Sequence, residues 1–217
     1  MRKDADDRKD ELIGAAESLF SEKGFNETSI DDICEKVEVA HGLFYYYFDS
    51  KENVIEAITE KMIKELVSNL EVIVKRSDLR ADEKFKRLLN LSFQKEKKKP
   101  YLASYYFREE SPKLFYNLFE RSNETLTPYL IDIVDQGVEE GIFRSEYPEQ
   151  TVRFWLNGRL FLFDRDRLEG KKFFEDIKAE AYLLERLLGI EDDFLTDFYE
   201  KNKIEIENFI EEISQGD

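Results

Sequence analysis

Residues Thr28–Lys51 read TSIDDICEKVEVAHGLFYYYFDSK, and this stretch decides the fold of the N-terminal part of the chain. Ser29 is a residue type preferred at a helix N-cap, and Asp31 and Asp32 follow where negative charge favours the helix dipole. Apolar residues then recur at helical spacing on one face: Ile30, Ile33, Cys34 and Val37. The pattern predicts a short amphipathic helix of two turns.

A second short helix is predicted over His41–Phe48, directly after a turn at residues 38–40. Phe44 and Phe48 are four residues apart and face inward. The outward face then carries small or flat groups and no carboxylate: Ala40, His41, Gly42, Tyr45 and Tyr46. Two short helices joined by a tight turn are typical of a helix–turn–helix, whose second helix enters the major groove of DNA.

At these residues the chain resembles the TetR family of transcriptional regulators. The matching pattern is G-F-x-x-T-S-I-x-x-I at Gly24–Ile33, V-x-x-G-x-F-Y-x-Y-F-x-S-K-E-x-V at Val39–Val54, and a weaker G-V-x-x-G-x-F at Gly137–Phe143. The resemblance implies a homodimer that binds a palindromic DNA operator, acts as a repressor, and is released by a small ligand held in a C-terminal domain.

The same resemblance implies the residues that contact DNA. Thr28, Tyr45, Tyr47 and the helix start at Lys51 would bind phosphates, and His41, Gly42 and Tyr46 would approach base edges. Leu43 replaces the small polar residue common in the family and could meet a thymine methyl group. The expected DNA-binding set is Thr28, Ser29, Ala40, His41, Gly42, Leu43, Tyr45, Tyr46, Tyr47 and Lys51.

The charge of the chain opposes this interpretation. The net charge is −16, and residues 1–51 hold seven Lys or Arg against thirteen Asp or Glu, a net of −6. Phosphate neutralisation usually supplies much of the affinity for DNA. We retain the DNA-binding interpretation because the motif is specific and net charge is not, and we expect few phosphate contacts by cations.

The remaining pattern is helical throughout, and the fold class expected is all-α with about ten helices. We expect a helix–turn–helix domain at residues 1–50, and a ligand-binding and dimerisation domain at residues 51–217 that starts with a connecting helix at 51–76. Further helices are expected at Ala81–Lys98, at Ser111–Gly141 with a break or kink at Pro128, and at Pro148–Asp164, Lys171–Leu188 and Asp192–Ile213. No apolar run reaches membrane-spanning length, the N-terminus does not resemble a signal peptide, and one Cys excludes an internal disulfide. We therefore expect a cytoplasmic protein.

The second domain is rich in aromatic residues, which indicates either an ordinary core or a pocket for a hydrophobic or aromatic effector. The expected lining is Phe85, Leu89, Tyr101, Tyr105, Phe115, Phe119, Trp155 and Arg159. Arg108 or Arg159 could pair with an acidic head group, and each could equally form a structural salt bridge.

The helix from Pro148 is apolar almost all round, so one face must be covered by something outside its own domain. We expect a symmetry mate to cover it in a four-helix bundle, through Val152, Gly158, Phe161, Ile177 and Leu184.

Nothing in the sequence indicates catalysis, a metal site or a cofactor. His41 is the only histidine, and the phosphate-binding, zinc-protease and serine-hydrolase motifs are absent. An alternative interpretation remains open: a helical small-molecule-binding or scaffold protein whose DNA binding is weak or lapsed.

Overall fold

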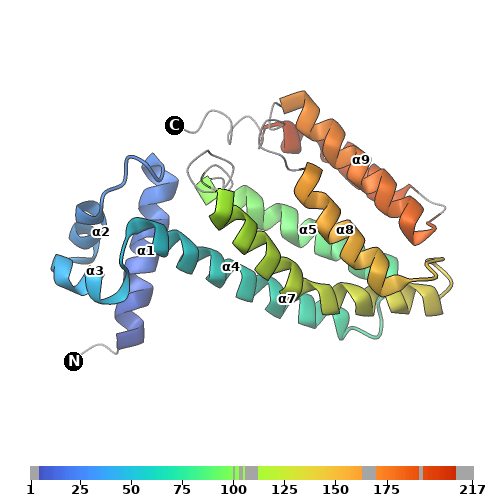
Figure 1. The fold of residues 1–217 in the computed structure, drawn as a ribbon, viewed down its shortest axis with the longest axis horizontal. Helices are drawn as coiled ribbons and strands as arrows, with labels where there is room; N and C mark the ends of the chain where they lie inside the picture. The colour runs from blue at the N-terminus through green and yellow to red at the C-terminus, as the bar shows by residue number, and fades with distance from the viewer. Residues whose placement is uncertain are drawn as a thin grey trace.

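The computed structural model describes residues 5–99, 101–102, 105, 112–162, 170–190 and 193–208. Within these ranges every regular element is a helix and no strand occurs, as expected (Figure 1). The helices are α1 (Ala5–Lys23), α2 (Ile30–Val37), α3 (His41–Tyr47), α4 (Lys51–Val74), α5 (Ala81–Lys98), α7 (Pro112–Glu139), α8 (Pro148–Leu162), α9 (Gly170–Leu188) and α10 (Phe194–Lys201).

The first three helices form a small unit at one end of the molecule (Figure 1). Its core is the first hydrophobic cluster, which buries the inward faces of α1, α2 and α3 together: Leu12, Ala16, Phe20, Phe25, Ile33, Cys34, Phe44 and Phe48. The first two turns of α4 are buried in the same cluster through Val54, Ile55 and Ile58. The start of α4 is therefore part of the core of this unit.

The long helix α4 runs from this unit into the second one, where α5, α7, α8 and α9 pack around a second hydrophobic cluster (Figure 1). The far end of α4 is fixed by the buried Lys84 of α5. The ammonium of Lys84 donates to Val74 O and to Gln136 Oε1 of α7, both at 2.6 Å. A cation at a helix C-terminus is favourable because the last carbonyls lack helical partners.

The structure differs from two expectations about helix continuity: a break at Pro128 and an uninterrupted last helix. Helix α7 runs through Pro128 without a break, although proline removes the amide that would bond Glu124 O. Packing on both sides of Pro128 holds the helix together, since Leu126 packs against the second cluster and Leu130, Ile133 and Val134 are buried in it. The last helix is interrupted by a turn at Asn202, and residues 209–213 lie outside the described residues.

The weak motif at Gly137–Phe143 has a packing explanation. A Cβ built on Gly137 would lie 2.0 Å from Cδ2 of Phe143, so only glycine leaves room for this buried ring. Gly141 has a φ of +71°, which an L side chain rarely adopts. Both glycines therefore shape the turn that follows α7.

No helix in the described part of the chain combines the length and the apolar character needed to cross a membrane.

Candidate nucleic-acid interface

The helix–turn–helix is held by local contacts that the sequence encodes. Ser29 Oγ accepts from Asp32 N at 3.1 Å, and Ser29 N donates to Asp32 Oδ2 at 2.7 Å, which makes a capping box at the start of α2. Lys23 at the end of α1 pairs with the same carboxylate at 2.8 Å. The hydrogen bonds from Lys23 and then from Ser29 hold the pKa of Asp32 well below its usual range, so this joint between α1 and α2 stays charged at neutral pH.

Helix α3 presents the face that the sequence predicts. Phe44 and Phe48 are buried, whereas Tyr45 is 56% exposed and Tyr46 is 74% exposed. Ala40, His41 and Gly42 are exposed as well, and Leu43 and Tyr47 are half-buried. The exposed surface of α3 is thus small or aromatic and carries no carboxylate of its own.

One acidic side chain does reach this surface from α2. Asp31 Oδ1 lies 2.9 Å from Nε2 of His41, and both side chains are more than half exposed. His41 therefore has a partner that the sequence analysis did not assign.

The side chains of two residues in the expected DNA-binding set are engaged within the fold. The Thr28 side chain is buried, and its hydroxyl donates to Gly24 O at 2.7 Å. The Lys51 ammonium donates to Phe25 O and to Thr28 O, both at 2.6 Å, and lies 4.1 Å from the centre of the Phe25 ring. Thr28 and Lys51 thus fasten the loop between α1 and α2 to the start of α4, which a one-dimensional motif does not reveal.

The other described cations of this unit also have partners within the chain. Arg8 pairs with Glu11 at 2.7 Å, and Lys36 pairs with Glu22 at 3.0 Å. Lys9 lies over the Phe48 ring, 5.6 Å from its centre. A phosphate group that used these cations would compete with contacts already made.

In the second unit the residues expected to line a pocket divide between two places. Phe85, Leu89 and Trp155 lie in or against the second hydrophobic cluster. Tyr101 and Tyr105 instead pack in or against the first cluster, beside the helix–turn–helix. Phe119 is half-buried, and the side chain of Phe115 lies outside what the structure describes. The residues of the expected lining therefore do not all lie in one hydrophobic cluster.

Arg159 is engaged in a buried polar contact between α8 and α9. Glu180, only 6% exposed, accepts the indole N–H of Trp155 at 2.8 Å, and Nε of Arg159 lies 2.8 Å from the same oxygen. The structural salt bridge is thus present, which weakens the expectation that Arg159 pairs with an acidic ligand. Glu180 was missed because nothing in the sequence links it to residues on another helix.

The expected dimer residues are also divided. Val152 and Leu184 are buried within their own protomer, so they cannot form an interface in this conformation. Ile177 and Gly158 are half-buried, a Cβ on Gly158 would meet no atom within 4 Å, and the Phe161 side chain is not described. Among the described side chains of α8 and α9, the exposed apolar ones are others: Phe154, Tyr182, Leu183 and Leu187.

Comparisons with known proteins give the fold and the family context. The family described as "Bacterial regulatory proteins, tetR family" matches residues 12–58. The HTH-type transcriptional repressor KstR2 of Rhodococcus jostii is 25% identical over 179 residues, covering 81% of this chain and 87% of that protein. These matches place the sequence similarity on the helix–turn–helix and extend it, more weakly, beyond it.

Two solved structures share the fold. RolR in complex with resorcinol has a TM-score of 0.62 at 18% identity, covering 90% of this chain and 94% of that one. Thermus thermophilus FadR, a TetR family transcriptional repressor in complex with lauroyl-CoA, has a TM-score of 0.60 at 18% identity, covering 85% and 96%. The arrangement of both units thus occurs in these two solved structures.

The position of Lys51 generates a prediction about stability. We expect Lys51→Ala to lower the free energy of unfolding by about 1–3 kcal/mol, because backbone carbonyls lose a charged hydrogen-bond donor. Urea unfolding followed by circular dichroism measures this. The matched control is Lys64→Ala, which removes an exposed lysine from the same helix. If both variants unfold like the unsubstituted protein, Lys51 does not fasten the loop.

Proposed function

We propose that this chain, a DNA-binding transcriptional regulator of the TetR family and not an enzyme, is a homodimeric repressor that an apolar effector releases from a palindromic operator. The observation that carries the proposal is the exposed face of α3. Large aromatic side chains are costly to leave in water unless they serve an interface. Here Tyr45 and Tyr46 stand next to each other on the helix that would enter the groove.

Because the described Lys and Arg side chains of the helix–turn–helix unit already have partners, we expect uncharged groups to make most of the phosphate contacts. Tyrosine hydroxyls and free amide groups at helix N-termini can donate to phosphates without a formal charge. A unit whose described cations already have partners should release few counterions on binding. We therefore propose that operator affinity depends only weakly on salt concentration. As a DNA-binding regulator, the protein would be located in the cytoplasm.

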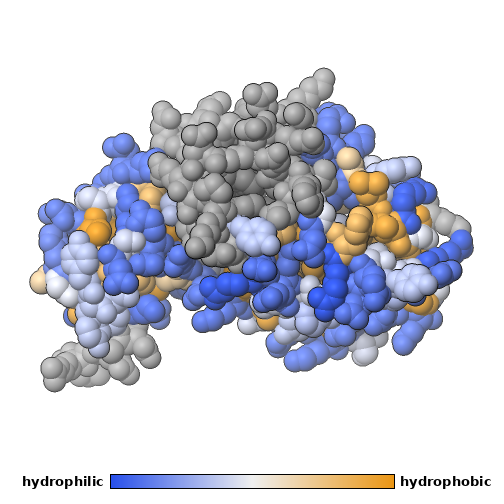
Figure 2. All heavy atoms as spheres, viewed as in Figure 1, coloured by the Kyte–Doolittle hydropathy of each residue, from blue (hydrophilic) through white to orange (hydrophobic). Residues whose placement is uncertain are grey.

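A second copy of the chain is the proposed occupant of the apolar face of α8 and α9. Figure 2 shows apolar surface gathered at the end of the molecule that these helices form. Phe154 is 70% exposed, and Leu183 and Leu187 lie four residues apart, so they share one side of α9. The open space beside Gly158 would let two copies of α8 approach closely. Two α3 helices would then face half-sites about 34–36 Å apart.

The effector is proposed to bind in the second unit, beside α4. RolR binds resorcinol and Thermus thermophilus FadR binds lauroyl-CoA, a flat aromatic compound and an acyl chain. Here the indole of Trp155 and the ring of Phe85, 5.8 Å apart, offer similar apolar surface. Because Lys84 fixes the far end of α4, a ligand that displaces the middle of this helix would tilt its beginning, which lies in the core of the helix–turn–helix.

The first test concerns α3. The unsubstituted protein is first used to select an operator from a random duplex library. We expect Tyr45→Ala and Tyr46→Ala each to weaken binding to this operator about tenfold. The melting temperature of each variant should be unchanged. A tenfold change corresponds to about 1.4 kcal/mol, the size of one hydrogen bond. The control is Tyr147→Ala, which removes an equally exposed tyrosine from the second unit. Failure to select any duplex would favour the alternative, a ligand-binding protein with lapsed DNA binding.

The second test concerns the dimer. We expect Phe154→Glu and Leu183→Glu to give monomers in sedimentation velocity, because each buries a charge in an apolar interface. Val72→Glu places the same charge at an exposed apolar residue of α4 and should leave the dimer intact. Dimers in both α8–α9 variants would show that the interface lies elsewhere.

The third test uses thermodynamic reciprocity. An effector that releases DNA must bind the operator-bound dimer more weakly than the free dimer, by about 5–150-fold for couplings of about 1–3 kcal/mol. Titration calorimetry with resorcinol and with lauroyl-CoA, in the presence and absence of operator, measures this ratio. Equal affinities for the two forms would mean that the site does not control DNA binding.

A further inference from the structure

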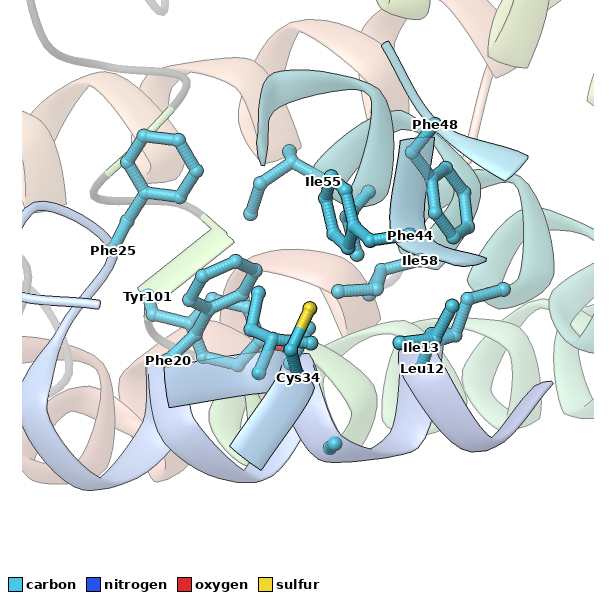
Figure 3. Close-up of a cluster of buried hydrophobic side chains, with 14 of the residues drawn as sticks. Leu12, Ile13, Phe20, Phe25, Cys34, Phe44, Phe48, Ile55, Ile58 and Tyr101 are labelled. Atoms are coloured by element: carbon cyan, nitrogen blue, oxygen red, sulfur yellow. The ribbon is translucent and has the colours of Figure 1, made fainter. Parts of the chain in front are cut away.

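A short segment of the second unit is built into the core of the first. Tyr101 and Leu102, which follow α5 in the sequence, are 7% and 4% exposed and belong to the first hydrophobic cluster. Figure 3 shows the Tyr101 ring beside Phe20 of α1 within this cluster. The helix–turn–helix therefore touches the second unit at a place other than α4.

The contacts of this segment are specific. The ring centres of Tyr101 and Phe20 are 5.9 Å apart, and those of Tyr105 and Phe25 are 4.5 Å apart. Lys99 forms an ion pair with Glu17 of α1, and both side chains are about three-quarters buried. We name Lys99, Tyr101 and Tyr105 the strut.

The strut and α4 converge on the same ring. The Phe25 ring contacts Tyr105 on one side, and the Lys51 ammonium at the start of α4 lies over it. A body held at one joint can rotate about it, whereas a body held at two joints has its orientation fixed. In the sequence, the strut lies between α5, which ends at Lys98, and α7, which begins at Pro112.

We propose that the strut is a second connection between the two units, which fixes the orientation of α1–α3 for operator binding and transmits a displacement of α5 or α7 to them independently of the tilt of α4. Lys99, Tyr101 and Tyr105 are then positioning residues for DNA binding and do not touch DNA. The proposal rests on the proposed function for its biological meaning, although the contact itself can be measured without DNA.

The hydroxyl of Tyr101 carries an energetic cost while the strut is docked. Its buried hydroxyl has no hydrogen-bond partner, and burial, with a smaller effect of Glu17, raises the pKa of the phenol well above its usual value. A neutral hydroxyl buried without a partner costs free energy that a hydroxyl in water does not. The contact thus combines favourable aromatic packing with a built-in penalty, which suits an element that must undock.

The test reverses the charges of the ion pair. We expect Lys99→Glu to weaken binding to the selected operator at least about fivefold, the lower end of typical couplings between sites. Glu17→Lys should also weaken binding, although it adds positive charge to the DNA-binding unit and would strengthen binding if charge alone mattered. The double variant restores the pair and should return the affinity to within about twofold of the unsubstituted protein.

Hydrogen exchange provides a readout that needs no DNA. In the unbound protein, Lys99→Glu should speed amide exchange over residues 12–37, and the double variant should restore protection. Tyr101→Phe keeps the ring and removes the hydroxyl without a partner, so it should slow exchange there. The matched control reverses Lys178 and Glu200, an ion pair between α9 and α10, and should leave exchange over residues 12–37 and operator affinity unchanged.

The outcomes separate this proposal from the proposed function. If neither the unsubstituted protein nor any variant binds a selected duplex, the DNA-binding proposal fails. Hydrogen exchange then still tests the contact between the strut and α1–α3. If Lys99→Glu and Glu17→Lys bind the operator like the unsubstituted protein, or if the double variant behaves as the sum of the single ones, the strut does not position α1–α3.

Discussion

The structure depends on one shared core: the first two turns of α4 are buried among the side chains of α1, α2 and α3. Val54, Ile55 and Ile58 are fully buried there, so α4 cannot move without moving the helix–turn–helix. The Lys51 ammonium reinforces this joint by binding carbonyls of the preceding loop. A boundary drawn at residue 50 therefore marks the start of a helix and does not separate two independent cores.

Most of the positively charged side chains described in this unit already bind groups of the protein, so few are left to bind DNA phosphates. Lys23, Lys36 and Arg8 pair with carboxylates of α1 and α2, and Lys51 is used in the fold. Exposed ion pairs of this kind contribute little stability, about 0–1 kcal/mol each, so phosphates could compete for some of them. We interpret the result as a unit whose recognition depends more on the shape and hydroxyl groups of α3 than on long-range attraction.

The second unit uses buried polar contacts to hold helices that would otherwise slide on apolar surfaces. Glu180 binds Trp155 and Arg159 across α8 and α9, and Glu185 accepts from the amides of Leu195 and Thr196 at the start of α10. Such carboxylates are costly to bury unless every partner is in place. They fix which faces of α8 and α9 point inward, and so which face stays exposed.

The sequence by itself determined the features that depend on neighbours within about one helical turn. The N-cap at Ser29, the two inward phenylalanines of α3 and the exposed tyrosines beside them follow from residue type and from spacing of three and four residues, and the structure has them. The resemblance to the TetR family rests on the same local pattern. The tertiary structure decided what depends on residues far apart in the chain: Lys51 on the carbonyls of the loop, Tyr101 and Tyr105 in the first cluster, and Phe154 rather than Val152 on the open face of α8. When a helix is apolar all round, its own sequence does not indicate which face is buried. Only the partners that pack against the helix determine which side remains exposed.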